Sequence, residues 1–390
     1  MAGVDFSSLL LASVASAGMA LVIILTKHRH QRWTADFEAS GVQKQHKGSP
    51  PRVGGVALGL GVLVALAVLA QSTAPGAVEG GRLVGWLALC SVPAVVSGLC
   101  DDLFKGVRAR WRLLGAALSA GLGMQLMGAV VPSVGLAALD PVVQWLPVGA
   151  ALTLLLVVGF THAMNIVDGL NGLASGLALL MLAATGYVAH TVQDLPLVYV
   201  CAALAAVVLG FAAVNFPRGA IFLGDGGAYF LGFSMAVVWV LLLVRNPGEV
   251  SPMFCIAVAF HPTMETIFSI LRRKLRRRRG DATAPDRLHL HTLLYRRKAL
   301  QLMSRFTWAE PWVANALAAM MVVAIAAPPT VSAAFHPESG LWQIAVVVVF
   351  ALVYFACFKL LVGFGAWRPA LPPAAAAAVE PDNLRTVDGH

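Results

Sequence analysis

Charge is scarce in this chain of 390 residues. Asp, Glu, Lys and Arg together make up 12% of the sequence, against roughly 25% in a typical soluble domain. Hydrophobic residues make up 58%, and the mean hydropathy is +0.78. This composition excludes an ordinary soluble domain and predicts a protein with many membrane spans.

Cysteine is sparse too, and none of it forms a C-x-x-C pair. The five cysteines lie within apolar runs or at their ends: Cys90, Cys100, Cys201, Cys255 and Cys357. We interpret them as small buried hydrophobic residues, which excludes a disulfide framework or a cysteine metal site. Acidic residues are fewer than basic ones, giving a net charge of +9. Because the bases gather in loops beside the apolar runs, they indicate orientation in a membrane and binding of anionic lipids or phosphates rather than of nucleic acid.

Apolar segments long enough to cross a bilayer predict an all-α polytopic membrane protein with about eleven transmembrane helices. These segments are residues 8–25, 53–70, 83–99, 113–131, 141–160, 173–190, 197–214, 228–244, 252–271, 312–327 and 341–362. We expect residues 1–362 to form one integral membrane domain. We expect the Ala/Pro-rich residues 363–390 to form a disordered tail.

The loops on the two predicted sides of the membrane differ sharply in charge. One set of loops, together with the C-terminal residues, holds 26 of the 28 Lys and Arg residues, whereas the opposite set holds Arg82 and Arg245. The excess of basic residues in cytoplasmic loops therefore predicts an N-terminus outside and a C-terminus in the cytoplasm.

Acidic residues stand at three span ends on the predicted cytoplasmic face. The stretch 161–172, THAMNIVDGLNG, contains Asp168, and the pair Asp101–Asp102 and Asp225 end other apolar runs. A carboxylate at the rim of a span is costly unless it faces a polar cavity. A polar connector between spans is the alternative for Asp168, and a solvated pair neutralised by nearby bases is the alternative for Asp101–Asp102. The recurrence of the pattern favours one site assembled from distant parts of the chain.

Carboxylates beside bases at a membrane face suit a magnesium-assisted reaction at phosphate. Mg²⁺ prefers one or two carboxylates together with phosphate oxygens and water, and a remaining carboxylate can position or deprotonate an attacking group. The basic run 272–279 also fits a cluster that binds anionic lipid. His289 and His291 are either ordinary loop histidines or ligands that face the acidic site.

Five motifs in order give the chain a recognisable pattern: HKGSPPRVGG, GLCDDLFK, NIVDGLNGLASG, FLGDGGAYFLG and PDRLHLHTLL. The chain resembles the polyprenyl-phosphate N-acetylhexosamine-1-phosphate transferases, glycosyltransferase family 4, the family of the bacterial WecA and MraY enzymes. The resemblance covers nearly everything from Gln45 to Tyr295. It implies a multi-pass protein of the bacterial inner (cytoplasmic) membrane with its active site on the cytoplasmic face. It also implies transfer of a sugar-1-phosphate from a UDP-N-acetylhexosamine to undecaprenyl phosphate, with release of UMP.

The resemblance also assigns residues. Asp101, Asp102 and Asp168 match catalytic positions, and Asp101 would orient or deprotonate the lipid phosphate. Asp225 would ligate Mg²⁺, or Mn²⁺ as the alternative, together with Asp168. Substrate contacts would come from Lys47, Lys105, Asn165, Asn171, Arg287, His289 and His291. Whether the chain forms a homodimer stays open.

Two departures place the chain within the family. Asn171 stands where many relatives carry a second aspartate, and the histidine loop reads HLHT, which argues against the MraY branch and its muramyl-pentapeptide substrate. PTMETIFSILRRK, with Glu265, resembles the O-antigen-initiating WecA-like branch, some of whose members use deoxy-N-acetylhexosamines. A transporter is the rival from another class, but its site would lie near the bilayer midplane within a repeat symmetry that this sequence lacks.

Overall fold

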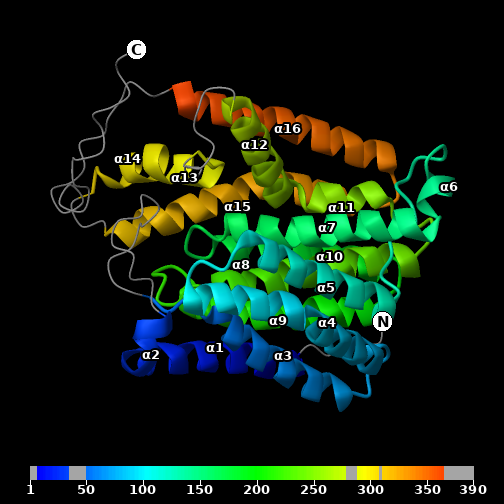
Figure 1. The fold of residues 1–390 in the computed structure, drawn as a ribbon, viewed down its shortest axis with the longest axis horizontal. Coiled ribbons are helices and arrows are strands. Elements are labelled where there is room, and N and C mark those ends of the chain that lie inside the picture. The colour runs from blue at the N-terminus through cyan, green and yellow to red at the C-terminus, as the bar shows by residue number, and fades with distance from the viewer. Residues whose placement is uncertain (1–6, 35–49, 278–287, 307–309, 364–390) are drawn as a thin grey trace.

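The computed structural model describes residues 7–34, 50–277, 288–306 and 310–363, and within these ranges the chain forms helices joined by loops, with no β-strand. The predicted tail from residue 364 onward lies outside them. The first half of the chain contains a short 3₁₀ turn, η1 (Ser7–Leu9), and helices α1 (Leu10–Leu25), α2 (Lys27–Thr34), α3 (Gly54–Ala70), α4 (Ala77–Phe104), α5 (Ala109–Met127), α6 (Asp140–Val143), α7 (Leu146–Val167) and α8 (Leu173–Thr191). Most of these helices run side by side along one direction (Figure 1).

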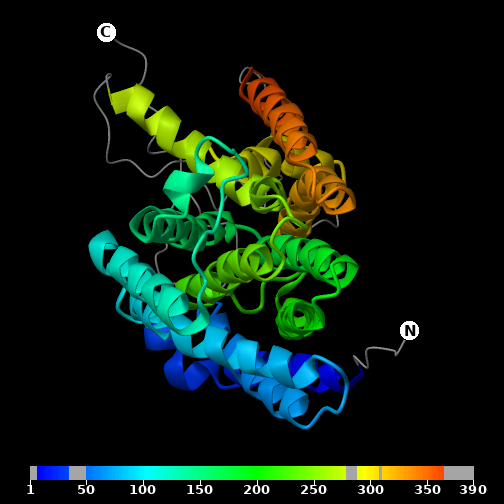
Figure 2. The same ribbon diagram turned by 90° about the vertical axis from the view of Figure 1, so that its right-hand side faces the viewer.

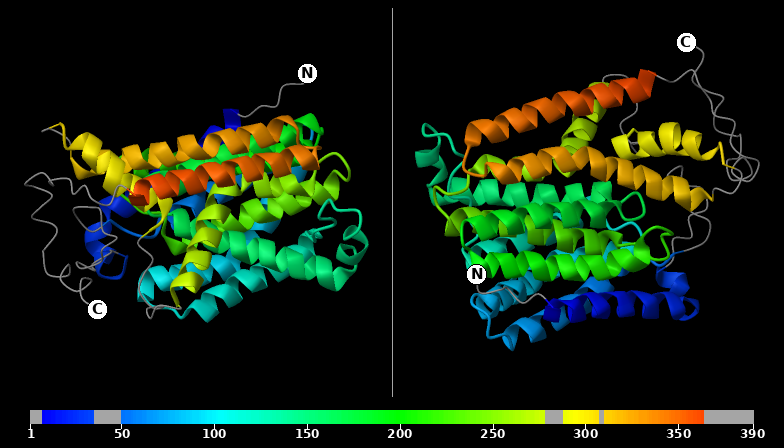
Figure 3. Two further views of the ribbon diagram at one scale, coloured as in Figure 1. Left: turned by 90° about the horizontal axis from the view of Figure 1, so that it is seen from above. Right: turned by 180° about the vertical axis from the view of Figure 1, so that it is seen from behind.

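The second half continues the bundle. It contains α9 (Leu195–Asn215), α10 (Gly224–Arg245), α11 (Pro252–Val258), α12 (Phe260–Arg277), α13 (Leu290–Leu294), the π-helical turn η2 (Tyr295–Ala299), α14 (Leu300–Met303), α15 (Pro311–Phe335) and α16 (Gly340–Gly363). Figures 2 and 3 show α1 and α3 on one flank of the bundle and α16 on the opposite flank.

Ten of the predicted spans overlap one helix or a bent pair of helices. The span predicted over residues 141–160 instead begins in α6 and ends within α7, which continues to Val167 into the stretch predicted as a connector. Seven described helices are long and apolar enough to cross a membrane, and nine are if each bent pair forms one span. The prediction of eleven adds α3 and α5. The 17 residues of α3 reach only about 26 Å, short of a hydrocarbon core of about 30 Å. In α5, Arg110 and Arg112 in the first turns shorten the apolar stretch.

The sequence prediction was wrong at two turns. The expected turn at Pro328–Pro329 lies inside α15, which continues to Phe335. The expected polar turn over residues 71–82 ends early, because α4 begins at Ala77. In both places the apolar surroundings of the neighbouring helices stabilise helical backbone where local sequence favours a break.

Helix α10 forms the centre of the bundle. In the most apolar stretch of 18 residues of α10, 94% of the residues are buried. The helix packs against α4 and α7 (Figure 1). Glycines allow its first turn to approach two neighbours closely. A Cβ on Gly98 of α4 would lie 2.6 Å from the Asp225 carbonyl carbon, and one on Gly55 of α3 would lie 2.6 Å from the Gly227 nitrogen. The start of α10 is thus fixed against two helix backbones.

The chain bends sharply at two helix pairs. Helices α1 and α2 meet at 88°, and α11 and α12 meet at 77°. Helix α12 consequently leaves the direction of the bundle, as Figure 1 shows. Its first turns carry His261 and Glu265, both buried, so the bend brings polar side chains against α13.

Candidate active site

Asp102 joins the end of α4 to the start of α10. Its Oδ1 accepts the backbone N–H of Asp225 at 2.9 Å, and its Oδ2 accepts that of Gly226 at 3.0 Å. The first N–H groups of a helix have no partner within the helix, and a carboxylate there is further stabilised by the helix dipole. Asp102 is 4% exposed, so it acts in the structure as a buried cap on α10.

Asp101, on the same last turn of α4, faces a different set of donors. Its Oδ1 accepts the backbone N–H of Val107 at 2.8 Å, and its Oδ2 accepts Nη1 of Arg112 at 2.8 Å. The same Nη1 lies 3.2 Å from Oδ2 of Asp225. Arg112 of α5 therefore bridges Asp101 and Asp225. The pair predicted to lie in a loop instead lies on the last turn of a helix that continues to Phe104.

Arg52 approaches Asp225 from the opposite side. Its Nη2 lies 3.3 Å from Oδ1 of Asp225, and its Nε lies 3.8 Å from Oδ1 of Asp102. Backbone hydrogen bonds hold this arginine in place, because Phe222 donates to the carbonyl of Pro51 and Gly54 donates to that of Phe222. The conformation of residues 50–55 thereby fixes a guanidinium over the start of α10.

Asp168 and Asn165 come from the end of α7. Asp168 is the residue after the last helical position. Burial, together with the negative charge of Asp225, raises the pKa of Asp168 to about 7, although Arg52 and the Gly224 backbone N–H lower it. The side chain of Asn165 is hydrogen-bonded to Asp225. The structure therefore brings together the three acidic positions that the sequence places more than fifty residues apart.

The charges of this group, which we call the aspartate cluster, do not balance. It consists of Asp101, Asp102, Asp168 and Asp225 with two arginines, Arg52 and Arg112. When all four carboxylates are ionised, the two guanidinium groups leave two negative charges uncompensated. A hard divalent cation with oxygen ligands fits this donor set.

Asn171 lies beside the cluster but is buried in a loop contact. Its Nδ2 donates to the carbonyl of Pro217 at 2.9 Å, and its backbone N–H donates to Oδ1 of Asn315 at 2.7 Å. Asn171 is 1% exposed. These hydrogen bonds connect the loop after α7 to two other parts of the chain, and the predicted contact of Asn171 with substrate stays a prediction.

A second polar group, which we call the histidine cluster, surrounds Glu265 of α12. Nδ1 of His289 lies 3.1 Å from Oε2 of Glu265, and Nδ1 of His291 lies 3.4 Å from Oε1. The two imidazole rings are stacked, with centroids 5.3 Å apart. Each of the three residues offers one atom that could bind a metal ion, and these atoms lie within 4.8 Å of one another. In the described part of the chain they form the candidate metal site.

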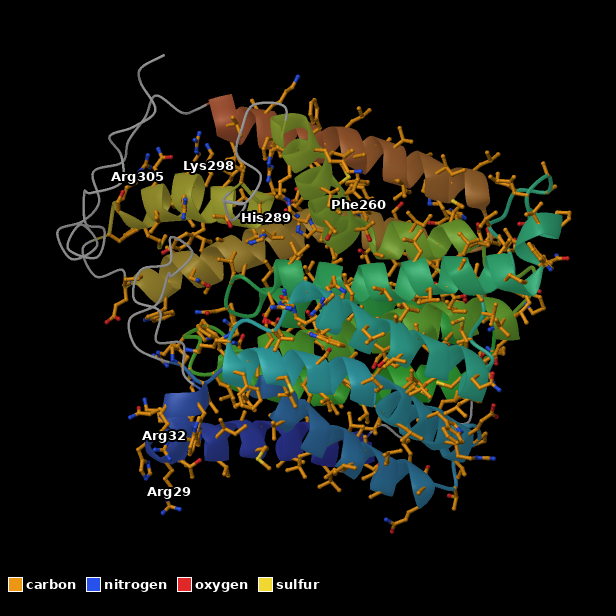
Figure 4. The ribbon with its side chains drawn as sticks, viewed as in Figure 1. Arg29, Arg32, Phe260, His289, Lys298 and Arg305 are labelled. Atoms are coloured by element: carbon orange, nitrogen blue, oxygen red, sulfur yellow. The ribbon has the colours of Figure 1, made fainter. Side chains whose placement is uncertain are left out.

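The two clusters meet at Gly169. A Cβ built on this glycine would lie 2.9 Å from Nε2 of His291, so the ring sits directly against the residue after Asp168. In Figure 4 the labelled bases Arg29, Arg32, Lys298 and Arg305 lie at one end of the bundle, and His289 lies inward of the last two, toward α12.

The remaining predicted contacts are less defined. Lys105 follows α4 and is exposed, and Lys47 and Arg287 lie outside the described residues. Sequence reasoning treated Arg52 and Arg112 only as loop charges, and it gave Glu265 no role. The sequence held one signal for the contact between Arg112 and Asp101: Arg112 lies in the first turn of the helix that follows the loop after Asp101.

Comparison with known proteins places the chain in a family. A sequence model described as glycosyl transferase family 4 matches residues 84–243, which include all four carboxylates of the aspartate cluster and Arg112. A probable undecaprenyl-phosphate N-acetylglucosaminyl 1-phosphate transferase from Bacillus subtilis (strain 168) is 30% identical over 254 residues, covering 64% of this chain and 66% of that protein.

Two further relatives extend the match. An undecaprenyl-phosphate alpha-N-acetylglucosaminyl 1-phosphate transferase from Yersinia pestis is 29% identical over 336 residues, covering 84% of each chain. A decaprenyl-phosphate N-acetylglucosaminephosphotransferase from Mycobacterium tuberculosis (strain CDC 1551 / Oshkosh) is 31% identical over 274 residues, covering 63% of this chain and 65% of the relative. The family predicted from the five motifs is thereby confirmed: the chain belongs to glycosyl transferase family 4.

Proposed function

We propose that the protein transfers an N-acetylhexosamine-1-phosphate from a UDP-sugar to undecaprenyl phosphate. A phosphate oxygen of the lipid attacks the phosphorus that carries the sugar. The bond from that phosphorus to the oxygen bridging the two phosphates breaks, and UMP leaves. The observation that carries the proposal is the aspartate cluster, assembled from α4, α7 and α10 in a chain whose relatives are named for this transfer.

The residues of the cluster divide into holding and reacting groups. Asp225 and Asp168 would hold Mg²⁺, or Mn²⁺ in its place, and the ion would neutralise the diphosphate when bound. Asp101 lies at the half-buried edge of the cluster, where it would orient the lipid phosphate or accept its proton. Asp102 holds the start of α10, and with it Asp225, in position. Arg52 and Arg112 are available to pair with phosphate oxygens when substrate enters.

The histidine cluster would contact the diphosphate or the sugar. His291 lies against Gly169, one residue from Asp168, so a substrate bound at the aspartate cluster is within reach of the imidazole. Lys47, Lys105 and Arg287 would add contacts to phosphate, and Asn165, hydrogen-bonded to Asp225, would border the nucleotide.

We further propose eleven spans in the bacterial inner membrane, with the N-terminus outside and the clusters on the cytoplasmic face. The division of basic residues, 26 against 2, supports this topology. So does the course of the described helices, because α1 begins at one end of the bundle and α16 ends at the other (Figure 1). The product would initiate O-antigen or another cell-envelope polysaccharide, and a homodimer is compatible with every feature above.

A panel of donors tests the function directly. Membranes containing the protein are incubated with undecaprenyl phosphate, Mg²⁺ and one UDP-sugar, and UMP is measured. We expect release with UDP-N-acetylglucosamine or a deoxy-N-acetylhexosamine donor and none when the lipid phosphate is omitted. Release only with the UDP-muramyl-pentapeptide would assign the protein to the MraY type. No release with any donor, from protein that is folded, would contradict the proposal and leave the transporter as the rival.

A further inference from the structure

Glu265 is a buried carboxylate that the reaction as described does not use. It is 1% exposed and lies on α12, one turn after the bend from α11. Its Oε2 accepts the backbone N–H of Leu290 at 3.3 Å and faces Nδ1 of His289 at 3.1 Å. Its Oε1 accepts the backbone N–H of His291 at 3.3 Å and faces Nδ1 of that histidine at 3.4 Å. One side chain therefore gathers two backbone donors and two rings of the same short segment.

These contacts fix the start of α13 against α12. The first N–H groups of a helix need acceptors, and a charge on α12 supplies them here from a distant part of the chain. Arg272, two turns further along α12, donates to the carbonyl of Leu288 at 2.8 Å. Both ends of the segment 288–291 are thus held by α12. An ionised carboxylate is retained in a buried position because three hydrogen bonds, from two backbone N–H groups and from Nδ1 of His289, satisfy it, and Nδ1 of His291 lies close by.

The arrangement determines which way the rings face. With Nδ1 of both rings directed at Glu265, the Nε2 atoms remain available on the other side. For His291 that side is Gly169, whose Cβ position lies 2.9 Å from Nε2. A carboxylate on one ring nitrogen and a reacting group near the other is how proteins fix the tautomer and orientation of a working histidine.

We propose that Glu265 is the positioning residue of this site: it holds His289 and His291 so that their Nε2 atoms meet the diphosphate of the nucleotide sugar beside Asp168. The assignment of the diphosphate as the ligand rests on the proposed function, whereas the anchoring of residues 289–291 by Glu265 does not.

Two other interpretations of the cluster predict different results. The three residues form a candidate metal site, but both carboxylate oxygens already have backbone N–H donors, so an ion would have to displace these bonds. Among the described residues, His261, whose Nε2 lies 3.9 Å from Oε1, is a further titratable side chain facing Glu265. A purely structural role would make Glu265 matter for folding but not specifically through the histidines.

A double-mutant cycle separates these interpretations. Glu265→Gln keeps the shape of the side chain and removes its charge, and we expect kcat/KM for UMP release to fall by about ten- to a hundredfold. The fall should appear mainly in KM for the UDP-sugar, because the histidines bind substrate. In a His289→Ala/His291→Ala background the same change should cost less than about twofold, because residues that act as a unit are not additive. Equal costs in both backgrounds would overturn the proposal.

Matched variants control for folding. Thr266→Val alters the next residue of α12 and should keep wild-type kinetics. The hydroxyl of Thr266 donates to the carbonyl of Pro262 on the same helix and does not contact the histidine segment in the described part of the chain. Gly169→Ala leaves Glu265 intact and places a methyl group against Nε2, so it should reproduce the loss in kcat/KM. A fully active Gly169→Ala protein would overturn the proposed placement of His291. This test still decides the question if the Glu265→Gln protein does not accumulate in the membrane.

A last measurement is independent of catalysis. Amide hydrogen exchange at Leu290 and His291, followed in the purified full-length protein, should be slow in the wild type and at least about tenfold faster in Glu265→Gln. If the wild type releases no UMP from any donor, the proposed function fails and this comparison still decides the anchoring. Unchanged exchange would overturn the anchoring, and so would stoichiometric bound zinc that Glu265→Gln loses.

Discussion

Replacing Asp102 by asparagine should destabilise the protein as well as slow it. The carboxylate accepts two backbone N–H groups at the start of α10, at 2.9 and 3.0 Å, while 4% exposed. Asparagine offers one oxygen and turns an N–H₂ group toward the second donor. Loss of one charge-assisted bond and an unsatisfied buried N–H together cost about 2–4 kcal/mol.

The assay is the midpoint of thermal inactivation in detergent, measured without added metal. We expect Asp102→Asn to lower the midpoint by roughly 5 °C or more and to reduce turnover, because Asp225 moves with the first turn of α10. Asp140→Asn is the matched control, since Asp140 accepts the Val134 N–H at 2.9 Å far from the cluster, and it should retain activity. A wild-type midpoint in Asp102→Asn, with activity lost, would refute the capping role and favour a direct chemical one.

Four further predictions concern Asp225, Asp168, Arg245 and the topology. Asp225→Asn should lose at least about 10² in turnover and respond abnormally to Mg²⁺; normal Mg²⁺ dependence at full activity would end its assignment as a ligand. Because the pKa of Asp168 is raised to about 7, protons should compete with Mg²⁺ below that pH, so the half-saturating Mg²⁺ concentration should rise by about tenfold per pH unit; a flat profile from pH 5.5 to 7 would contradict this. Arg245 binds Asp194, whose side chain is 3% exposed, through Nε at 2.8 Å, so Arg245→Met should cost about 3–5 kcal/mol and lower the thermal midpoint while kcat/KM stays normal. A reporter after residue 390 should be cytoplasmic and one inserted at residues 72–75 should lie outside; a cytoplasmic signal at the second position would overturn the topology.

Sequence reasoning reached the aspartate cluster because membrane burial makes its signal strong. Carboxylates at the ends of apolar runs are costly without partners, so Asp101, Asp168 and Asp225 stood out and the structure brings them together. The residues that balance them did not stand out. Arg52 and Arg112 occur among many loop bases, and only the packing of α4, α5 and the residues before α3 around the start of α10 distinguishes them from charges that face lipid headgroups.

The helix ends were predicted less well than the helices. Pro328–Pro329 suggested a turn, yet α15 continues through both residues, since backbone groups in apolar surroundings gain more from helical hydrogen bonds than local propensity costs. The bend between α11 and α12 was not predicted either. If the span over residues 252–271 is taken as straight, nothing in the sequence connects Glu265 with histidines more than twenty residues further along the chain.

The most direct test of the central claim follows the phosphate that carries the sugar. UDP-N-acetylglucosamine, or the donor that the panel selects, is labelled with ³²P at that phosphate and incubated with undecaprenyl phosphate, Mg²⁺ and the purified protein. Transfer of a sugar-1-phosphate places the label in the lipid product and releases unlabelled UMP in equal amount, and Asp225→Asn should abolish both. Label released into water as UDP, or retained entirely in the donor by folded wild-type protein, would contradict the account.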